Sequence, residues 1–159
     1  MYIEVKVGAL IMDPNSNTPI VVLKGIESEI ILPIWVGAYE ANAIALEIEK
    51  VVPQRPMTHD LLRNLITEIG CQVQKISVTD LIDNTFYAVI EITDKSGNVI
   101  TLDARPSDAI ALALRVDCPI FVAQKVLDIS NASTSMQTKL EDNLDDLNKP
   151  QEEWPDLIG

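Results

Sequence analysis

Two short stretches of this 159-residue chain place an arginine and aspartates at the start of a predicted helix. One, RPMTHD, runs from Arg55 to Asp60, and the other, DARPSD, runs from Asp103 to Asp108. A helix N-terminus has free backbone N–H groups and partial positive charge, so an adjacent arginine makes it a good site for a phosphate or a carboxylate. We therefore predict that Arg55 and Arg105 bind phosphate.

Carboxylates and the only histidine of the chain are candidate groups for catalysis. A third stretch, LPIWVGAYEA from Leu32 to Ala41, places Glu40 at another strand-to-helix junction. His59 can act as a general acid or base. A divalent metal, Mg²⁺ or Mn²⁺, suits carboxylate ligands, for which Asp103 and Asp108 are the candidates. The candidate catalytic residues are Glu40, His59, Asp60, Asp103 and Asp108.

Helix capping alone could explain several of these residues. Thr58 and Ser107 are typical N-cap residues, and Asp60 and Asp108 in the first turn would stabilise the helix dipole. Arg105 could simply pair with a nearby aspartate and hold the turn. Capping and a functional site therefore both remain open for the two stretches.

Composition and charge limit the functions that the chain can have. Twelve Lys and Arg against 24 Asp and Glu give a net charge of −12, whereas proteins that bind nucleic acid usually have a basic surface. The phosphate-binding motif GxxxxGK[ST] is absent, and so are GxGxxG, HExxH, GxSxG and paired CxxC.

In the third stretch, Trp35 and Tyr39 could stack on a base, or could fill the core or an oligomer contact.

We expect a cytoplasmic protein with reduced thiols. The two cysteines, Cys71 and Cys118, match no metal-ligand spacing. No apolar run approaches the roughly 18–20 residues that cross a membrane, and the first residues, MYIEVKV, do not resemble a signal peptide.

A repeated order of elements must position the candidate residues. Period-2 alternation predicts strands, and 3.6-residue periodicity predicts helices. The order strand–strand–strand–helix occurs twice, and the two helices share the sequence AIAL at Ala43–Leu46 and Ala109–Leu112. We predict an α+β fold: a duplicated strand–strand–strand–helix unit, a largely antiparallel sheet and an extra helix between the copies. The expected elements are strands Met1–Met12, Pro19–Leu23, Glu29–Val36, Gln72–Ile82, Phe86–Thr93 and Val99–Asp103, with helices Ala38–Val51, Thr58–Ile69 and Ser107–Arg115.

Composition separates a domain at residues 1–127 from an acidic tail at residues 128–159. Half of the net charge lies from Asp128 onward, and Ser130–Ser135 has the composition of a linker. We expect a mobile tail with a short amphipathic helix between Met136 and Leu147. Alternatively, the tail is a peptide motif that binds a protein partner through Trp154 and Leu157.

Three segments of the body resemble the bifunctional nuclease domain family. They are LPIWVGAYEANAI, RPMTHDLL and, most specifically, DARPSDAIALALR followed by PIFVAQKVL. The resemblance is collinear from about residue 3 to residue 127 and covers none of the tail. It implies a compact, internally duplicated α+β domain, assembly as a homodimer, and nuclease activity on both DNA and RNA. It supplies no catalytic residues that can be carried over to this chain.

Two functions remain open. The first is a nuclease that uses a divalent metal to hydrolyse phosphodiester bonds of DNA and RNA. The second is a non-catalytic oligomeric module that recognises a protein or a small anionic ligand, which the acidic charge favours. Neither reading involves a membrane.

Overall fold

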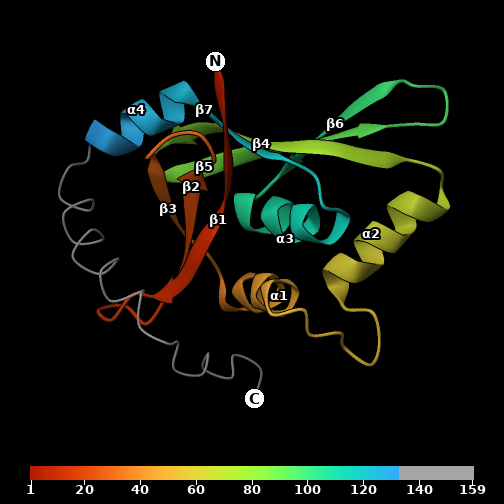
Figure 1. The fold of residues 1–159 in the computed structure, drawn as a ribbon, viewed down its shortest axis with the longest axis horizontal. Coiled ribbons are helices and arrows are strands. Elements are labelled where there is room, and N and C mark those ends of the chain that lie inside the picture. The colour runs from red at the N-terminus through yellow and green to blue at the C-terminus, as the bar shows by residue number, and fades with distance from the viewer. Residues whose placement is uncertain (133–159) are drawn as a thin grey trace.

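A seven-stranded sheet with four helices makes up the part of the chain that the computed structural model describes, residues 1–132 (Figure 1). The strands are β1 (Tyr2–Met12), β2 (Pro19–Gly25), β3 (Ile31–Trp35), β4 (Gln72–Ile82), β5 (Thr85–Thr93), β6 (Val99–Ala104) and β7 (Ile120–Ala123). The helices are α1 (Ala38–Ile48), α2 (Thr58–Glu68), α3 (Pro106–Val116) and α4 (Gln124–Ala132).

The sheet confirms the predicted duplication and the largely antiparallel pairing. Its strand order is β3-β2-β1-β7-β4-β5-β6, so the meanders β1-β2-β3 and β4-β5-β6 lie on either side of β7. Every neighbouring pair is antiparallel except β4 and β7. Each meander is followed by its helix, α1 or α3, and α2 lies between the two copies in the chain. The fold class is therefore α+β, as predicted.

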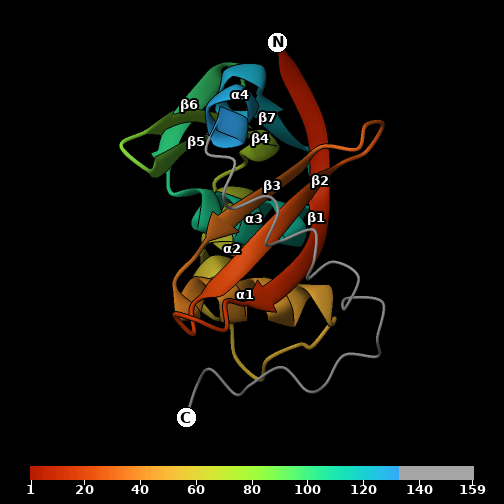
Figure 2. The ribbon, with the colours of Figure 1, turned by 90° about the vertical axis from the view of Figure 1, so that its left-hand side faces the viewer.

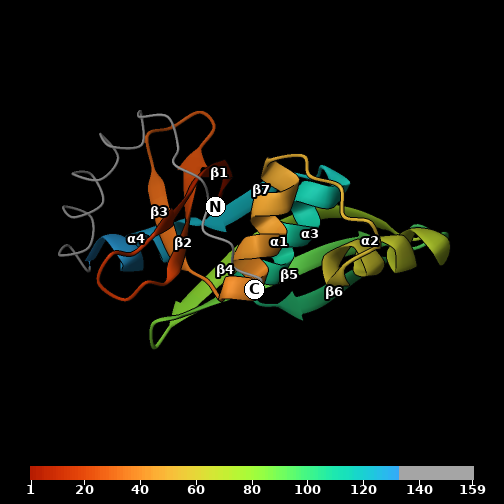
Figure 3. The same ribbon diagram turned by 90° about the horizontal axis from the view of Figure 1, so that it is seen from below.

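The helices of the two copies pack against each other through small side chains. α1 contacts α3, and α3 also contacts α2, β4 and β5 (Figure 3). Ala41 and Ala43 of α1 and Ala109 and Ala111 of α3 are buried, and such small residues let two helices approach closely. Ile110 and the other large apolar residues of this layer fill the space above the sheet. This packing brings the first turns of the helices together.

Helix α4 lies at the opposite end of the molecule from α2 (Figure 1). It begins beside the N-terminus, where the Gln124 N–H donates to the Met1 carbonyl oxygen at 3.0 Å (Figure 2). Val126 and Leu127 are buried in the core. The sequence did not predict this helix, and it continues past residue 127, the expected end of the domain, to Ala132. The predicted tail helix, Trp154 and Leu157 lie outside the described residues.

The predicted N-caps, Thr58 and Ser107, are wrong. Met57 and Arg105 occupy the N-cap positions of α2 and α3, so Thr58 is the first residue of its helix and Ser107 is the second. Proline is well suited to a first helical position because its φ is fixed and it has no N–H to satisfy. Pro106 therefore starts α3 one residue before the predicted helix.

Among residues 1–132, none of the helices has the length and apolar character needed to cross a membrane.

Candidate functional site

Four of the predicted site residues form one connected group at the first turns of α1, α2 and α3. Glu40 Oε1 accepts a hydrogen bond from Arg105 Nη2. Arg105 Nε donates to Asp108 Oδ2 at 2.8 Å, and Asp108 Oδ1 contacts His59 Nε2 at 2.9 Å. We call Glu40, His59, Arg105 and Asp108 the helix-start cluster. The cluster joins both copies of the duplicated unit and the helix between them.

Local backbone geometry places these side chains. The residue before α1 is Gly37, and a Cβ at that position would collide with Glu40 Oε2. The absence of a side chain at Gly37 therefore leaves room for the Glu40 carboxylate. In α3, Pro106 follows Arg105, which has the extended conformation (φ −68°, ψ 143°) that a residue before proline favours. This conformation places Arg105 directly before the first turn of α3.

Exposure differs strongly within the helix-start cluster. The Arg105 side chain is 67% exposed and that of Asp108 is 28% exposed, whereas Glu40 is 13% and His59 is 11% exposed. Arg105 and Asp108 are therefore the cluster residues most accessible to a molecule in solution, whereas His59 is largely buried and contacts Asp108. The hydrogen bonds with Asp108 and Glu40 raise the pKa of Arg105, so its guanidinium stays charged.

Asp60 belongs to a different set of contacts, which is centred on Arg115. Arg115 Nε donates to Asp60 Oδ1 at 2.8 Å, and its other nitrogens donate to the carbonyl oxygens of Ala43, at 3.0 Å, and Ala111, at 2.8 Å. The Arg115 side chain is 2% exposed. Because these contacts connect α1, α2 and α3, Arg115 fixes the arrangement of the helices that carry the helix-start cluster.

Asp60 is held as a carboxylate in these contacts. Its Oδ2 accepts a hydrogen bond from the Met57 N–H at 2.9 Å. Burial acts to raise the pKa of Asp60, but the Met57 hydrogen bond and the contacts with Arg115 outweigh it and lower that pKa below its ordinary value of 3.8. The contacts of Asp60 are therefore those of a structural ion pair.

Arg115 was missed at the sequence level, although a signal was present. It follows the uninterrupted apolar run Ala109–Leu114, and a charged residue next to a buried run needs a partner. Its partner is 55 residues away in the chain, so no local pattern could identify it.

Asp103 and Arg55 do not join the helix-start cluster. Asp103 lies on β6, opposite Val89 of β5, and its side chain is exposed. Arg55 is exposed in the loop before α2. Among residues 1–132, no hydrogen bond or ion pair connects either side chain to the cluster. The predicted site residues thus separate into four that meet, one structural aspartate and two that stand apart.

A metal ion would not find a ready set of ligands in this arrangement. Both oxygens of Asp108 are already engaged, and Glu40 is paired with Arg105. In the part of the chain that the structure describes, no group of three or more His, Cys, Asp or Glu side chains could hold a metal ion. Asp108 contacts His59 and Arg105, and among residues 1–132 no hydrogen bond connects it to Asp103, the second expected ligand.

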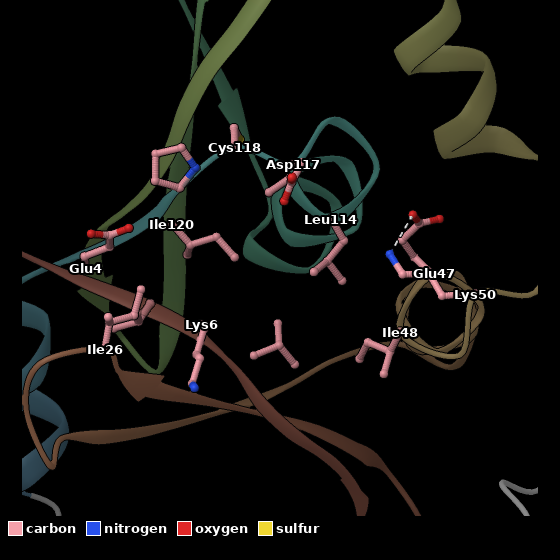
Figure 4. A pocket seen from close by; sticks show the side chains of 14 residues that line it. Glu4, Lys6, Ile26, Glu47, Ile48, Lys50, Leu114, Asp117, Cys118 and Ile120 are labelled. Carbon is pink, nitrogen blue, oxygen red and sulfur yellow. Dashed lines mark ion pairs between the residues drawn. The ribbon is translucent and has the colours of Figure 1, made fainter.

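A separate groove of about 590 Å³ lies at the other ends of α1 and α3 (Figure 4). Its walls carry mixed charges, among them Lys6 of β1 and Glu47 of α1, over an apolar floor. Cys118 lines the groove, but burial, with a smaller contribution from Asp117, raises the pKa of its thiol to about 11. A thiol with that pKa is a poor nucleophile at neutral pH. None of the predicted site residues lines this groove.

Comparison with known proteins identifies the family. The bifunctional nuclease domain family matches residues 21–135. An uncharacterized protein of Mycobacterium tuberculosis is 44% identical over 124 residues, which is 78% of this chain and 73% of the relative. Bifunctional nuclease 2 of Oryza sativa is 32% identical over 97 residues, and bifunctional nuclease 1 of Arabidopsis thaliana is 29% identical over 108 residues. The matched segments make up only 30% and 33% of these two plant proteins. The chain belongs to the bifunctional nuclease domain family.

Proposed function

We propose that this protein hydrolyses phosphodiester bonds of DNA and RNA at the helix-start cluster. The observation that carries this proposal is the contact of the only histidine, His59, with Asp108, beside the exposed charge of Arg105, in a member of this family. The plant relatives that bear the name bifunctional nuclease support the reaction class.

Each cluster residue has a role that follows from its position. Arg105, the most exposed member, binds phosphate oxygens and stabilises the negative charge that develops on them during hydrolysis. Asp108 accepts a proton from the attacking water as the water oxygen bonds to phosphorus; the bond to the leaving oxygen breaks, and that oxygen takes up a proton from solvent. His59 holds Asp108 in position and shares the proton, so the two act as a pair. Glu40 is a positioning residue that orients Arg105.

A metal requirement stays a prediction. No three or more His, Cys, Asp or Glu side chains are grouped as metal ligands among the described residues, so each step of this mechanism is assigned to the side chains themselves. Cleavage with Mg²⁺, with Mn²⁺ and with EDTA tests the requirement separately from the assignment of the cluster.

The test of the cluster uses two aspartates of the same DARPSD stretch. Asp108→Asn keeps the shape of the side chain and removes its basicity, so we expect cleavage of labelled DNA and RNA to fall by about 10²- to 10⁴-fold. Asp103→Asn is the matched control and should cleave like the wild type, because Asp103 lies outside the cluster. Equal cleavage by both variants would show that the activity comes from another site or from a contaminant.

A binding module is the second candidate function. The observation that favours it is that Arg105 is already neutralised by two carboxylates in a chain with a net charge of −12. Such a module would bind a protein or a small anionic ligand without cleaving nucleic acid. Failure of the purified protein to bind DNA or RNA at low salt, with Mg²⁺ or Mn²⁺ present, would favour this function.

Three other expectations stay predictions: a homodimer, a cytoplasmic location and a protein partner for the tail. The exposed edge strand β6 supports the first. It ends the sheet, and Val99, Ile100 and Leu102 on it are exposed. An apolar edge strand with unpaired backbone groups can pair with the same strand of a second copy.

A further inference from the structure

We propose that the helix-start cluster takes single-stranded nucleic acid, with an unpaired base stacked on Tyr39 while Arg105 holds a phosphate of the same strand. This inference rests on the proposed function and specifies its substrate class. It gives a role to the aromatic residues that the catalytic assignment leaves unused.

Tyr39 is an aromatic ring without a structural role in the described fold. It lies in the first turn of α1 and is 79% exposed, the highest value for an aromatic residue among residues 1–132. The buried face of α1 consists of Ala41, Ala43, Ile44 and Ala45, so Tyr39 is not part of it. Trp35, at the end of β3 four residues earlier, is also partly exposed, at 37%.

Chain connectivity places Tyr39 next to the phosphate-binding group. The residue after Tyr39 is Glu40, whose carboxylate holds Arg105. Consecutive Cα atoms are about 3.8 Å apart, so Tyr39 and the carboxylate that holds Arg105 start from neighbouring backbone positions in the first turn of α1. We infer that one strand contacts both Tyr39 and Arg105.

Arg105 supplies the positive charge of this region. Its side chain is 67% exposed, although its Nε donates to Asp108 and its Nη2 donates to Glu40. Arginine suits phosphate because its planar guanidinium can donate two parallel hydrogen bonds. A phosphate of the bound strand would compete with these two carboxylates for the guanidinium.

Stacking on Tyr39 selects for single strands. In a duplex the bases are paired and stacked, so a side chain on the surface cannot cover a base face unless the nucleotide leaves the helix. In a single strand every base offers a free face, and stacking on an aromatic side chain is tolerant of sequence. Binding should therefore be largely independent of sequence and should favour unpaired DNA and RNA over duplexes.

The experiment measures binding rather than cleavage. Fluorescence anisotropy with a labelled single-stranded oligonucleotide, and with its duplex, is recorded at low salt, and gels verify that the oligonucleotides stay intact. We expect Tyr39→Ala to weaken single-strand binding by about 5- to 150-fold and to leave duplex binding unchanged. Tyr39→Phe keeps the ring and should bind like the wild type. Tyr2→Ala is the matched control, because Tyr2 is exposed at the start of β1, where it pairs with Ala123 just before α4.

Three results would overturn the inference. Tyr39→Ala could bind single strands with the affinity of the wild type, or it could lose the same affinity for single strands and for duplexes. The third result is that the wild type does not bind single strands. Cleavage by the same samples separates this inference from the proposed function. If the wild type cleaves, and Tyr39→Ala binds single strands as tightly as the wild type does, only the proposed substrate class is wrong. If nothing cleaves but single-strand binding depends on Tyr39, the nuclease function is wrong and the binding surface stands.

Discussion

Removal of the Arg115 side chain should destabilise the protein more than removal of any exposed arginine. Arg115 is 2% exposed and donates to Asp60, Ala43 and Ala111, which lie on three helices. Arg115→Met keeps much of the apolar volume but leaves the Asp60 carboxylate buried without its partner. Breaking one side of a buried ion pair costs about 3–5 kcal/mol, and we expect a loss of this size in the free energy of unfolding.

Urea unfolding followed by circular dichroism measures this loss. Arg55→Met is the matched control, because Arg55 is exposed in a loop, and it should change the free energy of unfolding by less than about 0.5 kcal/mol. The double variant Asp60→Asn with Arg115→Met tests the pair itself. It should recover part of the loss, because no unpaired charge then stays buried. A cost below about 1 kcal/mol for Arg115→Met alone would refute the reasoning that this arginine connects the helices.

Three further predictions concern pH, the Glu40 side chain and assembly. Because the pKa of Asp60 is lowered in the folded state, its contribution to stability is present above pH 3.8 and is lost as the pH falls through the folded pKa. Unfolding of the wild type and of Asp60→Asn between pH 7 and pH 2.5 should therefore show a difference that shrinks in acid, and a constant difference would contradict this assignment. Gly37→Ala should displace the Glu40 carboxylate and reduce cleavage by about 10- to 100-fold with little effect on Tm, whereas unchanged cleavage would remove Glu40 from the mechanism. Leu102→Lys on the β6 edge should convert a dimer to a monomer in light scattering, and a dimer that persists would place the interface elsewhere.

The sequence predicted most of the fold because local patterns control most of its elements. Strand alternation predicted β4 with its observed bounds, Gln72–Ile82, and the repeated element order predicted the two meanders. The position of β7 between the meanders could not be predicted. Its four residues have no distinctive period, and its parallel pairing with β4 is a non-local contact. The expected boundary at residue 127 divides α4, so neither part was long enough to show the periodicity of a helix.

The candidate site was predicted in part, for a related reason. Helix starts are visible in a sequence, so Glu40, His59 and Asp108 could be identified as residues of first turns, and Arg105 as a residue directly before a helix. The contacts among these residues could not be predicted, because His59 is 49 residues from Asp108 in the chain and Arg105 is 65 residues from Glu40. Spacing alone also could not show that Asp60, next to His59, pairs with Arg115 instead.

Cleavage by Asp108→Asn, beside Asp103→Asn and the wild type, tests the central claim most directly. All three proteins are purified identically, their folding is verified by circular dichroism, and each is incubated with labelled single-stranded DNA and RNA in Mg²⁺, Mn²⁺ or EDTA. If the helix-start cluster is the active site, Asp108→Asn loses activity and Asp103→Asn keeps it, because Asp108 contacts both His59 and Arg105. Activity of folded Asp108→Asn equal to that of the wild type would contradict the assignment of the site.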